Sequence, residues 1–220
     1  MIATIYLLLG LAMLGLVAWL WPRRQHMHTP ARGAVVACVV ALLLASASVL
    51  MIALARWGLT NDGMLHAQRM LGLAAQHMSV PLLGLACLFL AKGLHWAPSL
   101  WGKIILGLMG FYQLLRYMEL SEGYLWLVNL VGAGALLAAA LLYIGRDKRI
   151  TVLCLVAPIG LLAPAVLTDS WPLAGLFTAS QQASWLIPGF VAAGLAVGLL
   201  SEQAHNSVSN GPAVNSTTPS

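Results

Sequence analysis

The stretch His66–His95, HAQRMLGLAAQHMSVPLLGLACLFLAKGLH, is long and apolar enough to cross a bilayer, yet it carries polar side chains at or inside one boundary. On a helix that turns by about 100° per residue, His66 and His77 lie about 20° apart. Arg69 and Gln76 fall about 60–80° to one side of them. We therefore expect these four side chains to form one stripe. Lipid cannot satisfy polar groups, so the stripe must face other helices or a wet cavity.

The composition of the whole chain predicts a membrane protein. Of its 220 residues, 60% are hydrophobic and 8% are charged, whereas a soluble domain carries about a quarter charged residues. No soluble fold of this length could bury so much apolar surface, so the lipid bilayer must be the solvent. The apolar runs are continuous rather than alternating, which disfavours a β-barrel. We predict an all-α, polytopic transmembrane bundle.

The apolar runs predict about seven spans followed by a polar tail. The spans cover approximately residues 2–21, 33–55, 66 or 70 to 92, 100–118, 124–145, 150–168 and 183–200. We expect residues 1–200 to form one transmembrane domain, and residues 201–220, rich in Ser, Asn and Pro, to form a disordered cytoplasmic tail. Pro158 and Pro164 predict that the sixth span is broken or strongly bent. Residues 169–182 are expected outside it, partly re-entering the membrane.

Basic residues indicate the orientation, because Lys and Arg in short loops stay on the cytoplasmic side. With the N-terminus outside, the inner loops receive Arg23, Arg24, Arg32, Lys92, Lys103, Arg146, Lys148 and Arg149. The outer loops receive Arg56, Arg69 and Arg116, together with Asp62, Glu119, Glu122 and Asp169. This asymmetry predicts an outside N-terminus and a cytoplasmic C-terminus, most naturally in a bacterial inner membrane. The basic residues are thus topology signals, and no nucleic-acid partner is expected.

Two pairs of segments in the chain weakly resemble each other. This similarity is compatible with an internal repeat, in which three spans, a linker span and three further spans follow one another. The segment LARWGLTNDGMLHA resembles LTDSWPLAGLFTAS, and AQHMSVPLLGLA resembles QQASWLIPGFVAAGLA. The two alignments need gaps between them, and apolar helices also resemble each other by chance. Parallel repeats of this kind occur in some transporters, with binding sites between the halves.

The polar side chains of the outer half suggest a carrier or sensor for a small solute, and His77 is the residue that could link it to protons. The expected ligand-binding residues are His66, Arg69, Gln76, His77, Arg116 and Glu119. We also expect Arg69 or Arg116 to neutralise Glu119, because an unpaired charge there would be costly. The competing interpretation of His77 is structural: a hydrogen bond to a neighbouring helix that helps packing.

Two other functional classes stay open. A membrane-embedded metal or redox enzyme would need converging ligands, and only His77 is clearly within the membrane, which disfavours a haem with two axial histidines. An accessory subunit or homo-oligomer would dock through small residues in the second and fifth spans. A retinal protein is excluded because the seventh span has no lysine. Cys38, Cys87 and Cys154 are read as small buried hydrophobes. The sequence indicates no catalytic residue, no metal ligand and no particular cofactor.

Overall fold

The computed structural model describes residues 2–27, 29–59, 61–94, 96–180 and 183–209, and within these ranges every regular element is helical. The α-helices are α1 (Ile2–Arg23), α2 (Thr29–Arg56), α3 (Asp62–Lys92), α4 (Pro98–Tyr117), α5 (Ser121–Tyr143), α6 (Lys148–Leu167), α7 (Ala174–Phe177) and α8 (Ala183–Ser209). A 3-10 turn, η1 (Arg24–His26), follows α1. The predicted all-α class is confirmed.

Six helices of the described chain, α1, α2, α3, α5, α6 and α8, are long and apolar enough to cross a membrane. The chain is therefore a multi-pass membrane protein. The fourth expected span also forms a helix, α4, but it is not among the six. Lys103, Gln113 and Arg116 lie within its 20 residues and reduce its apolar character. Six of the seven apolar spans that we expected are thus present, and the fourth is a helix of lower apolarity.

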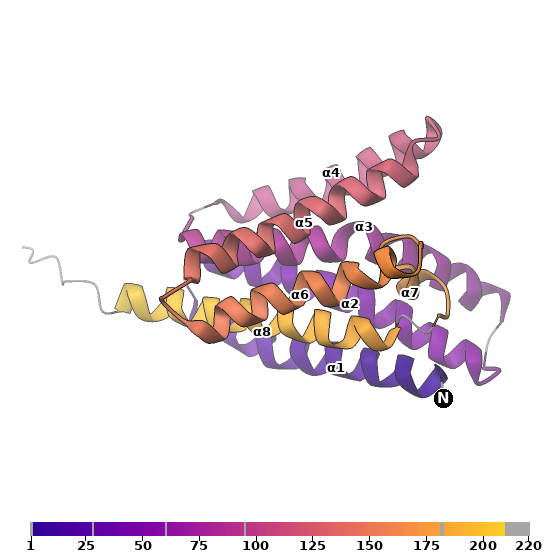
Figure 1. Ribbon diagram of the computed structural model, residues 1–220, viewed down its shortest axis with the longest axis horizontal. Helices are drawn as coiled ribbons and strands as arrows, with labels where there is room; N and C mark the ends of the chain where they lie inside the picture. Colours follow the sequence, from indigo (N-terminus) through magenta and orange to yellow (C-terminus); the bar gives the residue numbers. More distant parts are fainter. Residues whose placement is uncertain (1, 28, 60, 95, 181–182, 210–220) are drawn as a thin grey trace, which may run out of the picture.

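The six apolar helices lie side by side in one bundle (Figure 1), and their contacts link them into a closed ring. Around the ring, α1 contacts α2, then α3, α5, α6 and α8 follow, and α8 returns to α1. The helix α4 lies outside the ring against α2, α3 and α5. The short helix α7 packs on α2, α3 and α8. This arrangement leaves α4 and α7 as the two elements added to a six-helix bundle.

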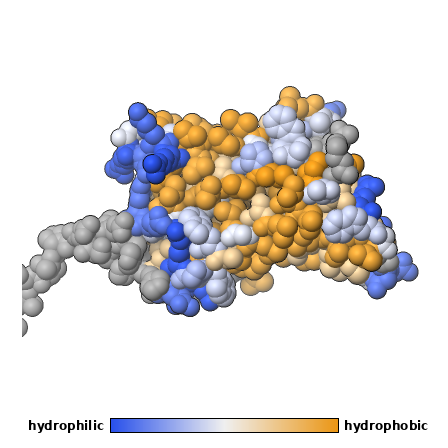
Figure 2. Space-filling model, turned by 90° about the horizontal axis from the view of Figure 1, so that it is seen from below, coloured by the Kyte–Doolittle hydropathy of each residue, from blue (hydrophilic) through white to orange (hydrophobic). Residues whose placement is uncertain are grey.

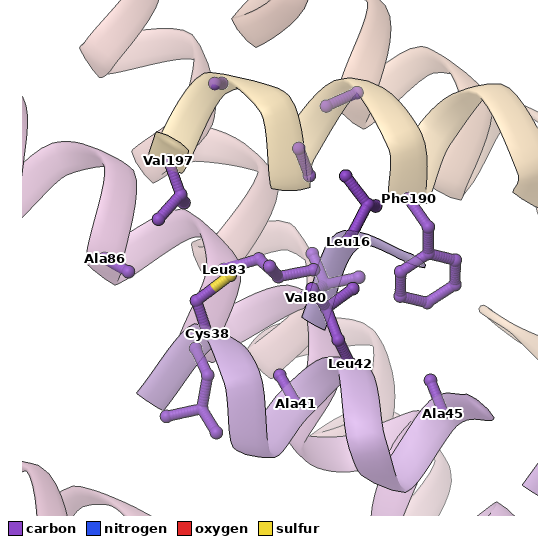
Figure 3. Close-up of a cluster of buried hydrophobic side chains, with 14 of the residues drawn as sticks. Leu16, Cys38, Ala41, Leu42, Ala45, Val80, Leu83, Ala86, Phe190 and Val197 are labelled. Atoms are coloured by element: carbon purple, nitrogen blue, oxygen red, sulfur yellow. The ribbon is translucent and has the colours of Figure 1, made fainter. Parts of the chain in front are cut away.

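The helix α3 is the most enclosed of the six. Of its most apolar 18 residues 78% are buried, against 28% for α1. It contacts α2, α4, α5, α7 and α8. Figure 3 shows part of the core on its inner side, where Val80 and Leu83 of α3 lie among Leu42 of α2, Leu16 of α1 and Phe190 of α8. The helix runs unbroken through Pro81 from Asp62 to Lys92. It begins at Asn61, whose side chain accepts a hydrogen bond from the Met64 N–H.

The polar residues gather at the two ends of the bundle. Figure 2 shows an apolar band across the middle of one face, with hydrophilic side chains on either side of it. At the end opposite α7, Arg23 of α1 forms an ion pair with Glu202 of α8, and Gln203 donates to Asp147. The helix order places the eight basic residues expected inside at this end and the other three at the α7 end. This segregation agrees with the expected orientation, which stays a prediction.

The structure differs from the expectation within α6 and at the end of α8. The sixth span is one continuous helix through Pro158 and Pro164, so the expected break is not present. Membrane helices tolerate proline where neighbouring groups satisfy the freed backbone. The last helix continues to Ser209, so residues 201–209, which we assigned to the tail, extend α8. The remainder of the expected tail, 210–220, lies outside the described residues.

Glycines set the close approach of α3 and α5. A Cβ placed on Gly132 of α5 would lie 2.6 Å from the carbonyl carbon and oxygen of Val80. Gly84, one turn further along α3, would meet the Gly132 backbone in the same way. The backbones of the two helices therefore touch, as small residues allow in membrane bundles.

We predict that Gly132→Ala destabilises the bundle because the new Cβ forces the two backbones apart. Overpacking of this kind costs about 1–3 kcal/mol, so the midpoint of thermal unfolding in detergent should fall. Gly134→Ala, two residues along the same helix, is the control, because its Cβ would meet nothing within 4 Å. Equal melting of the two variants would contradict this account of the crossing.

Candidate functional site

The segment from Pro172 to Ser180 contains α7, and its first half packs into the bundle whereas Thr178 near its end is exposed. Leu173 is 2% exposed and Leu176 is fully buried. A four-residue helix leaves most of its backbone N–H and C=O groups without intrahelical partners. At this depth other groups of the protein must satisfy them.

Two glutamines of α3 bind carbonyls of this segment. The Gln68 side-chain amide donates to the Phe177 carbonyl at 2.9 Å, and the Gln76 amide donates to the Pro172 carbonyl at 3.2 Å. Both side chains are buried. Because one glutamine holds each end of α7, the segment lies along about two turns of α3.

Side chains of α1 and α2 complete the attachment. The Ser48 hydroxyl of α2 donates to the Leu176 carbonyl at 2.5 Å. The Tyr6 hydroxyl of α1 donates to the Thr178 carbonyl at 3.0 Å and accepts from the Ser180 N–H at 2.9 Å. We call the four side chains that hold the segment, Tyr6, Ser48, Gln68 and Gln76, the clasp. All four are uncharged.

Gly72 allows the segment to reach α3. A Cβ on Gly72 would lie 2.8 Å from the Leu176 carbonyl oxygen and 3.1 Å from the Phe177 Cα. Gly72 falls between Gln68 and Gln76, so these three residues share the face of α3 that supports α7.

His77 lies on a different face of α3, in a small cluster between α3, α4 and α5. Its side chain is 3% exposed. The imidazole contacts the Tyr112 ring with centroids 3.9 Å apart and stacks on the Tyr124 ring at 6.0 Å. The Tyr124 hydroxyl donates to the Leu108 carbonyl at 2.9 Å, which ties the start of α5 to the middle of α4.

The hydrogen bonds of His77 define its tautomer and leave one nitrogen without a partner. Nδ1 lies 2.7 Å from the Leu73 carbonyl oxygen. A carbonyl can only accept, so Nδ1 carries the proton and Nε2 presents a lone pair. Nε2 is buried and has no hydrogen-bond partner. The imidazole thus makes its one hydrogen bond within its own helix.

Two further buried oxygens on the same helices also lack partners. Asn129 of α5 donates to the Gln76 and Leu125 carbonyls, at 3.1 and 2.8 Å, but its Oδ1 is unpaired. The Ser79 hydroxyl of α3 is buried and unpaired as well. Each such group is unfavourable in an apolar interior unless something binds it.

The expected site residues fall into two groups. Gln76 and His77 are buried in the bundle, but adjacent residues of a helix point about 100° apart, so Gln76 faces α7 and His77 faces α4 and α5. The other four expected residues are exposed at the α7 end: His66, Arg69, Arg116 and Glu119. The predicted single stripe is therefore divided between two neighbourhoods.

The expected neutralisation of Glu119 is not present. Within the described chain, the ion pair that forms is Arg23–Glu202, and none joins Glu119 to Arg69 or Arg116. Glu119 lies in the turn between α4 and α5 with φ at +60°, and its side chain is exposed. Water solvates an exposed carboxylate, so no partner is required.

The structure adds residues that the sequence analysis did not select. These are Tyr6, Ser48, Gln68, Tyr112 and Tyr124. One signal was available: Gln68 lies two turns before Gln76 and about 80° from it, so both belong to one broad polar face. The tyrosines and the serine carry no comparable signal, because such residues are common in membrane helices.

The described residues contain no group of three or more His, Cys, Asp or Glu side chains that could hold a metal ion.

Cys38, Cys87 and Cys154 are buried free thiols. The Cys87 and Cys154 thiols lie within interaction distance of each other. The sequence analysis treated them as unrelated, because α3 and α6 are distant along the chain.

Comparison of the chain with known protein families, with characterised proteins and with solved structures found no match. The functional argument therefore depends on the geometry of the two neighbourhoods.

We predict that Tyr6→Phe destabilises the protein. Loss of the hydroxyl leaves the partly buried Ser180 N–H without its acceptor, and the loss of such a hydrogen bond costs about 1 kcal/mol. Tyr117→Phe is the matched control because Tyr117 is 89% exposed. Thermal unfolding in detergent should show a lower midpoint for Tyr6→Phe alone. An unchanged midpoint would mean that the Tyr6 hydroxyl does not help to hold α7.

Proposed function

We propose that this protein is a membrane carrier for a small solute, with transport linked to protons through His77. The solute binds inside the bundle, near Gln76 and His77, in the half that contains α7. The exposed residues His66, Arg69, Arg116 and Glu119 act at the entrance, where they meet the solute before it reaches the interior.

The unpaired Nε2 of His77 carries this proposal. An ionisable residue inside a membrane bundle is costly, so it is by default a candidate functional group. The structural interpretation requires His77 to bond a neighbouring helix, but its hydrogen bond goes to Leu73 of the same helix. The packing contacts with Tyr112 and Tyr124 would be available to a phenylalanine. The imidazole is therefore better explained by a group that binds Nε2, such as a proton or a hydroxyl of the solute.

No specific observation favours the two alternative classes. A metal enzyme needs converging ligands, and the described residues provide no group of three. An accessory subunit needs a defined docking surface. The exposed apolar side chains of α4, α5 and α6 are those that the bilayer itself would cover.

The test is solute-driven proton movement in liposomes. Purified protein is reconstituted with a pH-sensitive dye inside, and pools of sugars and polyols, amino acids, or nucleosides are added outside. We expect one pool to acidify the interior of wild-type vesicles. His77→Phe should reduce the signal to that of protein-free vesicles, because phenylalanine cannot carry a proton. His205→Phe, near the far end of α8, is the control and should behave as the wild type.

Folding of His77→Phe is checked by thermal unfolding. The lost bond runs to a carbonyl that retains its helical partner, so stability should change by no more than about 1 kcal/mol. Acidification by His77→Phe at the wild-type rate would refute the role of the imidazole. Absence of a signal from every pool with wild-type protein would argue against a proton-linked carrier.

A further inference from the structure

The clasp binds α7 in the way that a binding site holds a ligand. Four side chains from three different helices converge on one short segment, and each donates to a backbone carbonyl. Helices of a membrane bundle ordinarily pack through small residues and through individual hydrogen bonds between side chains. The interior face of the bundle at this end is therefore a row of hydrogen-bond donors, now occupied by carbonyl oxygens of the protein itself.

This donor row is electrically neutral. Its members are two amides, a hydroxyl and a phenol, and they are buried or nearly so. The charged residues at the same end are exposed: Arg56, Asp62, Arg69, Arg116, Glu119, Glu122 and Asp169. A charged solute would thus lose its hydration without gaining an opposite charge in the interior, which is strongly unfavourable.

Acceptors and a hydroxyl lie next to the donors. Ser79 is seven residues after Gly72, so it lies on nearly the same face of α3, about two turns deeper. Its buried hydroxyl has no partner. Asn129 of α5, whose amide donates to the Gln76 carbonyl, has an unpaired acceptor in Oδ1. The unpaired Nε2 of His77 lies at a similar level of the bundle, on the side of α3 that faces α4 and α5. Together these groups suit a solute that carries both hydroxyl donors and oxygen acceptors.

The α7 segment is joined to α6 by a strained turn rather than by a continuous helix. Asp169 and Leu173 have φ values of +46° and +54°, which L residues adopt at a cost. The segment can therefore leave the clasp while the six long helices stay intact, as local opening requires.

We propose that α7 is a lid, and that the clasp beneath it is the binding site of an uncharged, polyhydroxylated solute. In the closed state the carbonyls of α7 occupy the donors, and in the open state the oxygens of the solute replace them. This inference rests on the proposed carrier function, and it adds the class of solute and the element that controls access.

The lid is tested by hydrogen exchange of the α7 amides in lipid nanodiscs. In the closed state the Leu176 and Thr178 amides donate to Leu173 and Ala174. Gly72→Ala places a Cβ against the α7 backbone and should make these amides exchange about tenfold faster or more, by shifting the opening equilibrium. Gly107→Ala is the control, since its Cβ would meet nothing within 4 Å. If Gly72→Ala does not fold, Gln68→Ala removes one bond of the clasp and should act in the same direction.

The solute class is tested with matched neutral and charged probes in proteoliposomes. Radiolabelled sorbitol and glucose are the neutral probes, with gluconate and glucosamine as their charged counterparts. We expect saturable uptake of at least one neutral probe by wild-type protein, loss of that uptake in Gln68→Ala, and no uptake of the charged probes.

Three results would overturn the proposal: unchanged exchange of the α7 amides in both Gly72→Ala and Gln68→Ala, equal uptake of the charged probes, or no uptake of either neutral probe by wild-type protein. The carrier function is judged separately by the His77 experiment. Uptake that depends on His77 but not on Gln68 would refute the lid and its site while leaving the carrier in place. If wild-type protein shows no proton-linked transport, but the α7 amides still exchange faster in the variants, the carrier function would be refuted instead.

Discussion

The hydrogen-bonding demand of the α7 backbone is the constraint on which this end of the bundle depends. A non-helical segment at membrane depth is tolerated only where the protein itself satisfies its polar groups. Here Gln68, Gln76, Ser48 and Tyr6 meet that demand from three helices. The positions of α1, α2 and α3 relative to one another are consequently fixed at this end by the same short segment.

This constraint explains the unusual composition of α3. One face must be polar and small, so that Gln68 and Gln76 can reach α7 while Gly72 lets its backbone approach. The opposite side must pack on α5 through Gly84. His77 lies on the α5 side of α3, seven residues before Gly84, where its ring stacks on Tyr124 of α5. Its cluster with Tyr112 and Tyr124 is separate from the main apolar core, and its ring lies where α4 joins the bundle.

The sequence was sufficient for the features that depend on composition and segment length, and insufficient for those that depend on which helix meets which. Continuous apolar runs predicted about seven spans, and six of them form helices long and apolar enough to cross a membrane. We also expected Gln76 and His77 to face other helices or a wet cavity rather than lipid. Their separation into two neighbourhoods was not expected, because a helical wheel gives the angle between side chains but not the partner on each side. Tyr6 and Ser180 are 174 residues apart, and nothing local links them.

Counting apolar helices and tracing the path of the chain give different numbers of helices that run the length of the bundle. The helix α4 accounts for the difference. Asn129 lies beside Gln76, and Gly132 lies beside Val80, so α3 and α5 run in parallel. Two parallel helices joined by a third require that the third run the full length of the bundle in the opposite direction. At 20 residues, α4 is about 30 Å long, which matches the hydrocarbon thickness of a bilayer. Its lower apolarity is tolerable because its charged residues Lys103 and Arg116 are near its two ends. The chain therefore runs the length of the bundle an odd number of times, with the start of α1 beside α7 and the end of α8 at the opposite end.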